Sequence, residues 1–219
     1  MVIDRLRQWL SAVKPTTKVW VDDAAKWRGV CDEIAAARAH GASVVVTAHF
    51  HSTLTALEAA LRDCLIAFAS SSSLELSSFN LNQSLAGPTV LVVQSQNIRP
   101  RLGNASRSDV ARIVFVVVER YPTPGRDDTL LKTVVSLGSG CEVVYHLALS
   151  DPLLKEFNTE KIQTLLPRLG LSQHEALQSS IITTAIRNAQ KQIAQKVPHE
   201  VSASSPEEWF KTNLPRGHQ

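Results

Sequence analysis

Residues 125–133 contain the glycine, lysine and threonine of a phosphate-binding loop, in the order Gly-Arg-Asp-Asp-Thr-Leu-Leu-Lys-Thr. Such a loop has the pattern Gly-x-x-x-x-Gly-Lys-Ser/Thr, in which backbone N–H groups surround the phosphates and the lysine reaches them. In this chain Lys132 lies too far along by one residue, and the second glycine is absent. We therefore predict a loop that leads into a helix and holds no phosphate.

Two polar pairs could bind a metal ion or transfer protons. His49 and His51 follow an apolar run, but no acid or cysteine stands near them in the sequence to complete a metal site. Asp127 and Asp128 could act as paired carboxylates, although carboxylates at the start of a helix are also stabilised by the helix dipole. We favour a pair of loop histidines and a helix-start cap, and predict no metal site.

Two further stretches are less specific. Gly138-Ser139-Gly140 lacks the Gly-x-Ser-x-Gly spacing of a hydrolase elbow, so we predict a plain turn there. The arginines Arg99, Arg101 and Arg107 could form an anion site, but a solvated loop is the favoured interpretation.

The composition predicts a soluble, cytoplasmic protein. The net charge of +3 comes from 23 basic and 20 acidic residues spread along the chain, which is too mild to indicate a nucleic-acid partner. The 3 cysteines are far apart and form no Cys-x-x-Cys pair, so we expect reduced thiols. No apolar run reaches the length of a membrane span, and the N-terminus is charged rather than signal-like.

Alternating strand and helix patterns predict an α/β fold. Apolar, β-branched runs typical of buried strands lie at 18–21, 43–48, 64–69, 88–94, 112–118 and 143–149. Helical spacing predicts helices at 2–13, 22–40, 52–63 and 127–137, the second capped by Asp22 or Asp23 and the third by Ser52 or Thr53. Strand, helix and strand without hairpin spacing imply parallel pairing, and therefore a doubly wound sheet.

After residue 157 the sheet pattern stops, and helices are predicted at 158–168, 177–196 and 206–210. The helix at 177–196 carries an apolar stripe that is large enough to require burial, formed by Ile182, Ile186, Ala189, Ile193 and Val197. We expect this stripe to dock on its own chain or on a second protein. Trp209 is a further candidate anchor for a partner, whereas Trp9, Trp20 and Trp27 are expected in the core.

One long segment resembles a known family. Residues 112–157 combine a strand, the pair Glu119-Arg120, a helix, a glycine turn and Tyr145-His-Leu-Ala-Leu-Ser-Asp-Pro-Leu-Leu-Lys-Glu-Phe157. This order resembles the end of the second RecA-like motor domain of SecA, the preprotein translocase ATPase. The likeness continues into Arg168-Leu-Gly170 and Thr183-Thr-Ala-Ile-Arg-Asn-Ala-Gln-Lys191, where that family enters a long scaffold helix.

The resemblance implies a parallel, doubly wound RecA-like sheet of the P-loop NTPase type, here the second helicase-like domain, with a C-terminal helical extension. It implies a RecA-like domain at 1–157, an extension resembling the start of the scaffold at 158–200, and a tail at 201–219.

The residues that this family uses on ATP are mostly replaced. The family's first motor domain, which carries the phosphate loop, has no counterpart here, and the second domain should add arginines that stabilise the transferred phosphoryl group. Ile98 and Pro100 stand where glycines are expected, and neither can supply the left-handed turn or the free N–H groups of that loop. The nucleotide-cleft positions that remain are Arg99, Glu119, Arg120 and Lys132. Lys132 is the lone cation of the helix that should bear arginines, and lysine substitutes poorly for a bidentate guanidinium.

These observations lead to a first hypothesis of a catalytically degenerate, SecA-like domain that acts as a non-enzymatic binding or scaffold module. It would require no cofactor, and its partner would be a protein, either a secretion motor or a second copy. The alternative is a motor fragment that completes an ATP site with a separate chain. An enzyme of another type has no catalytic constellation in the sequence to support it.

Overall fold

The computed structural model describes residues 15–75, 90–99, 112–137, 140–156 and 175–214. The predicted helices at 2–13 and 158–168, residues 101–108, and residues 76–87 of the serine-rich connection lie outside this range. In chain order the elements are β1 (Thr16–Trp20), α2 (Asp23–Ala39), β2 (Ser43–Ala48), α3 (His51–Asp63), β3 (Ala69–Ser71), β4 (Leu74–Glu75), β5 (Val90–Gln94), η1 (Ser95–Asn97), β6 (Ile98–Arg99), β7 (Ile113–Val117), α4 (Pro124–Leu137), β8 (Cys141–Ala148), α5 (Pro152–Lys155), α7 (Ser180–Lys196) and α8 (Pro206–Asn213).

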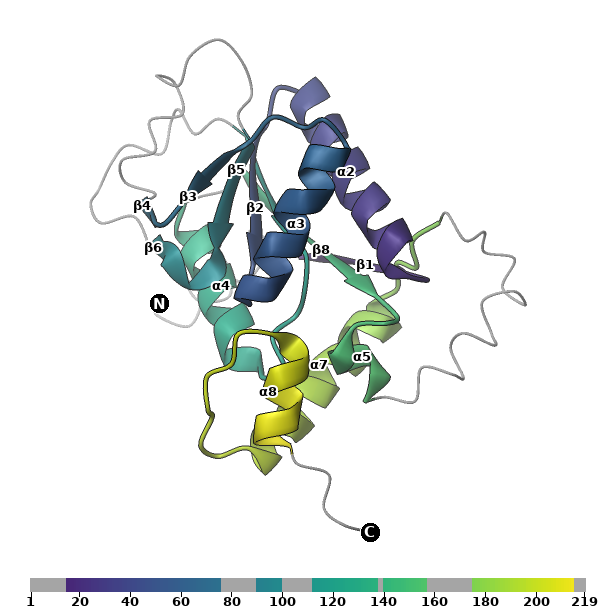
Figure 1. Ribbon diagram of the computed structural model, residues 1–219, viewed down its shortest axis with the longest axis vertical. Helices are drawn as coiled ribbons and strands as arrows, with labels where there is room; N and C mark the ends of the chain where they lie inside the picture. The colour runs from purple at the N-terminus through teal and green to yellow at the C-terminus, as the bar shows by residue number, and fades with distance from the viewer. Residues whose placement is uncertain (1–14, 76–89, 100–111, 138–139, 157–174, 215–219) are drawn as a thin grey trace, which may run out of the picture.

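The main sheet has 6 strands in the order β1-β8-β7-β2-β5-β3, and every pair in it is parallel (Figure 1). The strands β4 and β6 form a separate small pair. The predicted parallel pairing is therefore confirmed, including that of the strands at 113–117 and 141–148. This all-parallel α/β sheet is consistent with a RecA-like fold.

The sheet is buried on both faces because successive residues of a strand point to opposite sides. On one face, Val44 and Val46 belong to the core that the sheet forms with α2 and α3. On the other face, Val45 and Phe115 pack in a second core with Leu130 of α4. This double burial explains why the central strands read as continuous apolar runs.

A third core lies at the carboxyl ends of the strands, where α5, α7 and α8 pack together (Figure 1). Its members include Val19, Phe50, Tyr121, Leu147, Leu149, Leu153, Ile186, Ile193, Trp209 and Phe210. Just before α7, Leu177 exchanges two backbone hydrogen bonds of 2.8 and 3.0 Å with Val19 of β1. The C-terminal segment is thus part of the folded unit, and the short helix predicted at 206–210 is confirmed as α8, which continues to Asn213 and packs in this core.

The helix ends both confirm and correct the predictions. Asp22 caps α2 by accepting the N–H of Ala25 at 2.7 Å, as predicted. The prediction that Ser52 or Thr53 caps α3 is wrong, because the helix begins at His51 and no side chain of its N-cap, Phe50, bonds to it.

The predicted strand at 64–69 is also wrong. The N–H of Cys64 bonds to the carbonyl of Ala60 at 3.0 Å, and Leu65 takes a left-handed φ of 55°, so this run ends α3 and turns. The strand β3 begins only at Ala69. The helix α4 begins at Pro124, before the predicted Asp127, and α7 begins at Ser180 because Leu177 pairs with β1.

Candidate functional site

Ligands of open α/β sheets bind beyond the carboxyl ends of the strands, so a site is expected at the carboxyl edge of this sheet. His49 follows β2, Ser95 follows β5, and Glu119 and Arg120 follow β7. All four side chains are buried.

Asp127 is the centre of a buried polar cluster at this edge, and its side chain has no exposed surface. Its Oδ1 lies 2.7 Å from His49 Nε2, and its Oδ2 accepts hydrogen bonds from Gln190 Nε2 at 2.8 Å and Arg120 NH1 at 3.3 Å. His49 Nδ1 lies 2.7 Å from Ser95 Oγ. We call this set, His49, Ser95, Arg120, Asp127 and Gln190, the edge network.

The charge of Asp127 is stabilised inside the protein. Burial alone would raise the pKa of this carboxyl, but the hydrogen bond and charge of His49, with Arg120 and Gln190, outweigh burial and hold the pKa below its usual value. Asp127 is therefore an ionised partner for Arg120. Asp127 lies in the first turn of α4, as the predicted helix-start role requires. That prediction did not include its buried partners His49, Arg120 and Gln190.

Arg120 is held by contacts on several sides. Its NH2 donates to Thr17 Oγ1 at 3.0 Å, and its guanidinium stacks 3.3 Å from the ring centre of Tyr145, in addition to the bond to Asp127. Only 7% of its side chain is exposed. The planar group that could stabilise a phosphoryl transition state is thus engaged by residues of its own chain.

Glu119 binds the residues that lead into α3. Its Oε1 accepts the backbone N–H groups of His49 at 2.6 Å and Phe50 at 2.8 Å, and its Oε2 accepts the hydroxyl of Thr53 at 2.7 Å. Burial raises the pKa of Glu119, and His49 and these donors offset only part of that rise. Glu119 therefore fixes the turn between β2 and α3 by hydrogen bonds from residues on both sides of the helix start.

Ser95, His49 and Asp127 have the residue types of a catalytic triad. A nucleophilic serine must reach its substrate, whereas Ser95 is buried and is not among the residues that line the cavity described below. Among the described residues, no group of histidine, cysteine, aspartate and glutamate side chains could hold a metal ion. The arrangement fits a structural network of buried polar groups, in which only Arg120 Nε and Gln190 Oε1 among the atoms of the five side chains are buried without a partner.

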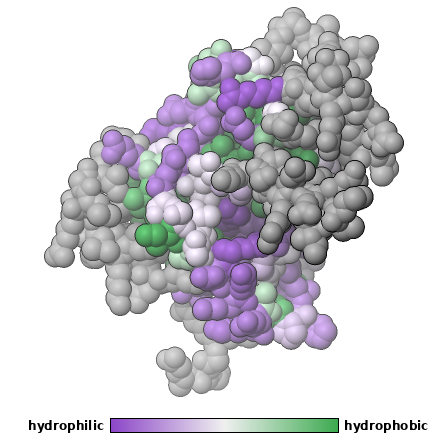
Figure 2. Space-filling view, turned by 180° about the vertical axis from the view of Figure 1, so that it is seen from behind, coloured by the Kyte–Doolittle hydropathy of each residue, from purple (hydrophilic) through white to green (hydrophobic). Residues whose placement is uncertain are grey.

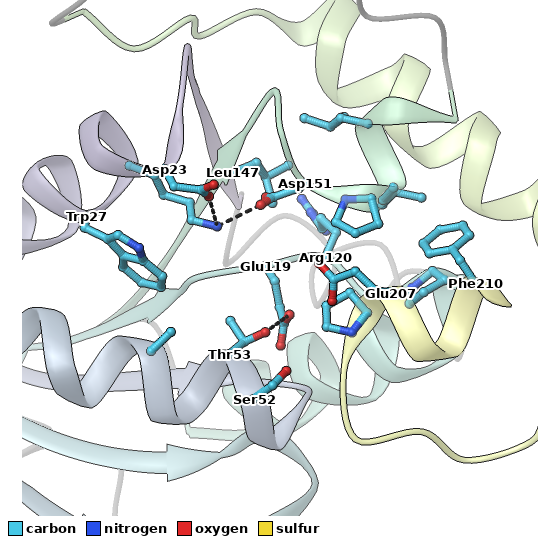
Figure 3. A pocket seen from close by; sticks show the side chains of 17 residues that line it. Asp23, Trp27, Ser52, Thr53, Glu119, Arg120, Leu147, Asp151, Glu207 and Phe210 are labelled. Carbon is cyan, nitrogen blue, oxygen red and sulfur yellow. Dashed lines mark hydrogen bonds and ion pairs between the residues drawn. The ribbon is translucent and has the colours of Figure 1, made fainter. Parts of the chain in front are cut away.

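A cavity of about 370 Å³ lies beside the edge network, between the starts of α2 and α3 and the helices α5 and α8 (Figure 3). We call it the edge pocket; its lining includes Asp23, Lys26, Trp27, Ser52, Thr53, Glu119, Arg120, Leu147, Asp151, Glu207 and Phe210. Lys26 is also paired, because its Nζ lies 2.8 Å from Asp151 Oδ1 and 3.6 Å from Asp23 Oδ1. The two cations of the pocket are thus both engaged by carboxylates, Lys26 by these two and Arg120 by Asp127.

The four predicted nucleotide-cleft positions differ in exposure. Glu119 and Arg120 are buried at the carboxyl edge, whereas Arg99 in β6 and Lys132 in α4 are exposed. Within the described part of the chain, neither Arg99 nor Lys132 forms an ion pair.

Most of the predicted partner-binding residues lie inside the protein. Ile186, Ala189, Ile193 and Trp209 are buried in their own chain, and Ile182 is partly buried. The side chain of Trp209 has no exposed surface and makes edge contacts with the rings of Tyr121 and Phe210. The stripe of α7 thus packs in cis, and its contact with a partner stays a prediction. In the view from behind, hydrophilic side chains dominate the described surface and hydrophobic ones form small separate areas (Figure 2).

Two members of the edge network were not predicted from the sequence. Ser95 and Gln190 are single polar residues in segments far apart along the chain, and only the fold brings them to His49 and Asp127. The one available signal was Gln190 itself, a polar residue beside Ala189 within the apolar stripe of α7.

Comparison with known proteins finds similarity to SecA proteins of several bacteria. No family model matches the chain. Over 85 residues, or 39% of the chain, it is 31% identical to the protein translocase subunit SecA of Clostridium perfringens strain 13 and 29% identical to that of Aliarcobacter butzleri. Over 75 residues, or 34% of the chain, it is 35% identical to SecA of Campylobacter hominis.

The matches cover about a tenth of the length of these curated relatives, 10% in the first two and 8% in the third. A region of this chain is therefore related to SecA. Within the described residues, no helix has both the length and the hydrophobicity required to cross a membrane.

Proposed function

We propose that this protein is a catalytically degenerate, SecA-like module that binds or supports another protein in translocation and does not hydrolyse ATP. The observation that supports this most is the state of Arg120. It is the cleft arginine that remains at the end of β7, and its guanidinium is bound to Asp127, Thr17 and Tyr145.

A catalytic arginine has to place its donors on the phosphoryl oxygens of the substrate. For Arg120 to do so, it would have to break its ion pair with the buried Asp127, which would keep only His49 and Gln190 as side-chain partners, and this is unfavourable. Glu119 already accepts the N–H groups of His49 and Phe50 just before α3, so these donors are not free for a second acceptor.

The alternative is a motor fragment that completes an ATP site with a separate chain. The relationship to SecA and the exposure of Arg99 and Lys132 favour it, because exposed cations are free to face a partner's nucleotide. It requires a partner that carries a phosphate loop, since the sequence contains no Gly-x-x-x-x-Gly-Lys-Ser/Thr pattern.

The resemblance to SecA also suggests the partner, the location and the domain bounds. The partner would be a protein, either a secretion motor or a second copy, and the protein would act in the cytoplasm without nucleic acid. Residues 1–157 would form the RecA-like domain, and residues 158–200 an extension like the start of the scaffold helix.

The test is an ATPase assay with the first motor domain of one of the matched SecA proteins as the partner. We expect the mixture to hydrolyse ATP no faster than that motor domain alone. Stimulation of ten-fold or more that is lost in the double variant Arg99→Ala/Lys132→Ala would overturn the scaffold proposal in favour of the split motor. A matched control is Arg112→Ala, which removes an exposed arginine on the amino-terminal side of β7.

A further inference from the structure

Two of the three cysteines meet where α2 packs against α3. Cys31 lies on the buried face of α2, and its Sγ is 4.0 Å from the carbonyl oxygen of Ala60 in α3. The backbone N–H of Cys64, which ends α3, donates to the same oxygen at 3.0 Å. The Cys31 sulfur and the backbone of Cys64 therefore both lie beside one atom, the carbonyl oxygen of Ala60.

The two thiols differ in accessibility. Cys64 is exposed, whereas Cys31 is 8% exposed and belongs to the core between the sheet and the two helices. Burial, with the neighbouring Cys64, raises the pKa of the Cys31 thiol to about 12. An oxidant in solution will therefore reach Cys64 first, because susceptibility follows exposure and thiolate character.

We propose that Cys31 and Cys64 form a peroxide-sensitive pair that closes into a disulfide between α2 and α3. In the first step, the sulfur of Cys64 attacks hydrogen peroxide and becomes a sulfenic acid, with release of one water. In the second step, the sulfur of Cys31 attacks the sulfenic sulfur, and the hydroxyl group leaves with the thiol proton as a second water. Two thiols are oxidised and one peroxide is reduced to two waters.

The link would join two helices that both line the edge pocket. Trp27 of α2 and Thr53 of α3 stand on its wall, and each helix begins at the carboxyl edge. A covalent bond further along the two helices would fix the spacing between these walls. A disulfide also stabilises a protein by restricting the unfolded chain.

The experiment treats the full chain with hydrogen peroxide and maps its cysteines by mass spectrometry of a non-reduced digest. We expect a linked pair of peptides that contain Cys31 and Cys64, two hydrogen masses below the sum of the free peptides. We also expect Tm to rise by roughly 5–15 °C and to return when dithiothreitol is added.

Two variants serve as controls. Cys64→Ser should abolish both the link and the rise in Tm, whereas Cys141→Ser should keep both, because Cys141 is buried in the core on the opposite face of the sheet. The proposal is overturned if Cys31 remains a free thiol while Cys64 proceeds to sulfinic acid or joins two chains. The map of the wild-type chain decides this even if a variant fails to fold.

Discussion

The two sides of the carboxyl edge differ in what fills them. On the side of α4 and α7, buried side chains of the edge network bond to one another. Gln190 of α7 donates hydrogen bonds to Asp127 and to the carbonyl of Tyr121. On the side of α2, α3 and α8, a cavity of about 370 Å³ stays between the elements. Arg120 lies on the boundary, since it lines the cavity and belongs to the network.

Under the proposed function, this difference is what a nucleotide-binding layout leaves when its scaffold is kept and its chemistry is lost. In that proposal Arg120 is a structural residue, because its guanidinium is bound to the buried carboxylate of Asp127. The edge pocket, on the other side, is lined by carboxyl groups such as those of Glu119 and Asp151, whose pKa values are both raised chiefly by burial. Neither side offers an unpaired buried cation to a phosphate among the described residues.

We expect the largest loss of stability when the charge of Asp127, on the side of the edge network, is removed. Asp127→Asn leaves Arg120 buried without a counter-charge, so we expect the free energy of unfolding to fall by about 3–5 kcal/mol. Urea denaturation followed by circular dichroism measures the change. Asp128→Asn is the matched control, because its ion pair with Arg187 is partly exposed and should be worth less than about 1 kcal/mol. Equal losses in the two variants would show that the edge network is not a special feature of the fold.

We expect a smaller loss of stability from a substitution in α7, the helix that carries Gln190 of the edge network. Ile186 of α7 is 3% exposed, and Ile186→Ala should lower the free energy of unfolding by about 2–4 kcal/mol. Ile181→Ala on the same helix removes the same atoms from a side chain that is 79% exposed, and should change stability by less than about 0.5 kcal/mol.

Light scattering of both isoleucine variants then separates cis from trans packing of α7. A monomer that is destabilised only by Ile186→Ala agrees with the packing seen here. A dimer that becomes a monomer in the same variant would show that the stripe of α7 belongs to an interface between chains.

The sheet could be predicted from the sequence because its signal is local. Strands such as 43–48 and 113–117 are β-branched runs buried on both faces, and a run of this kind identifies a strand without its neighbours. The error at 64–69 arose because an apolar run also suits the end of a helix. There the hydrogen bond of Cys64 to Ala60 and the left-handed Leu65 decided the structure.

The site could not be predicted to the same degree because its contacts are long-range. The start of α3 is held by Glu119, which binds the N–H groups of His49 and Phe50 and lies more than sixty residues along the chain, and not by a local cap from Ser52 or Thr53. The sequence suggests a loop histidine at His49 and a capping residue at Asp127, and their mutual bond at 2.7 Å appears only in the folded chain. The positions of Glu119 and Arg120 were predicted through the family resemblance, but their commitment to internal partners was not.

The central claim is that the chain's own residues have replaced the nucleotide at the carboxyl edge. Calorimetric titration of the purified chain with MgATP tests this most directly. We predict no heat of binding up to about 1 mM ATP, which corresponds to a binding free energy weaker than about −4 kcal/mol. A micromolar dissociation constant, near −8 kcal/mol, would contradict the account and show that Arg120 and its neighbours still serve a nucleotide.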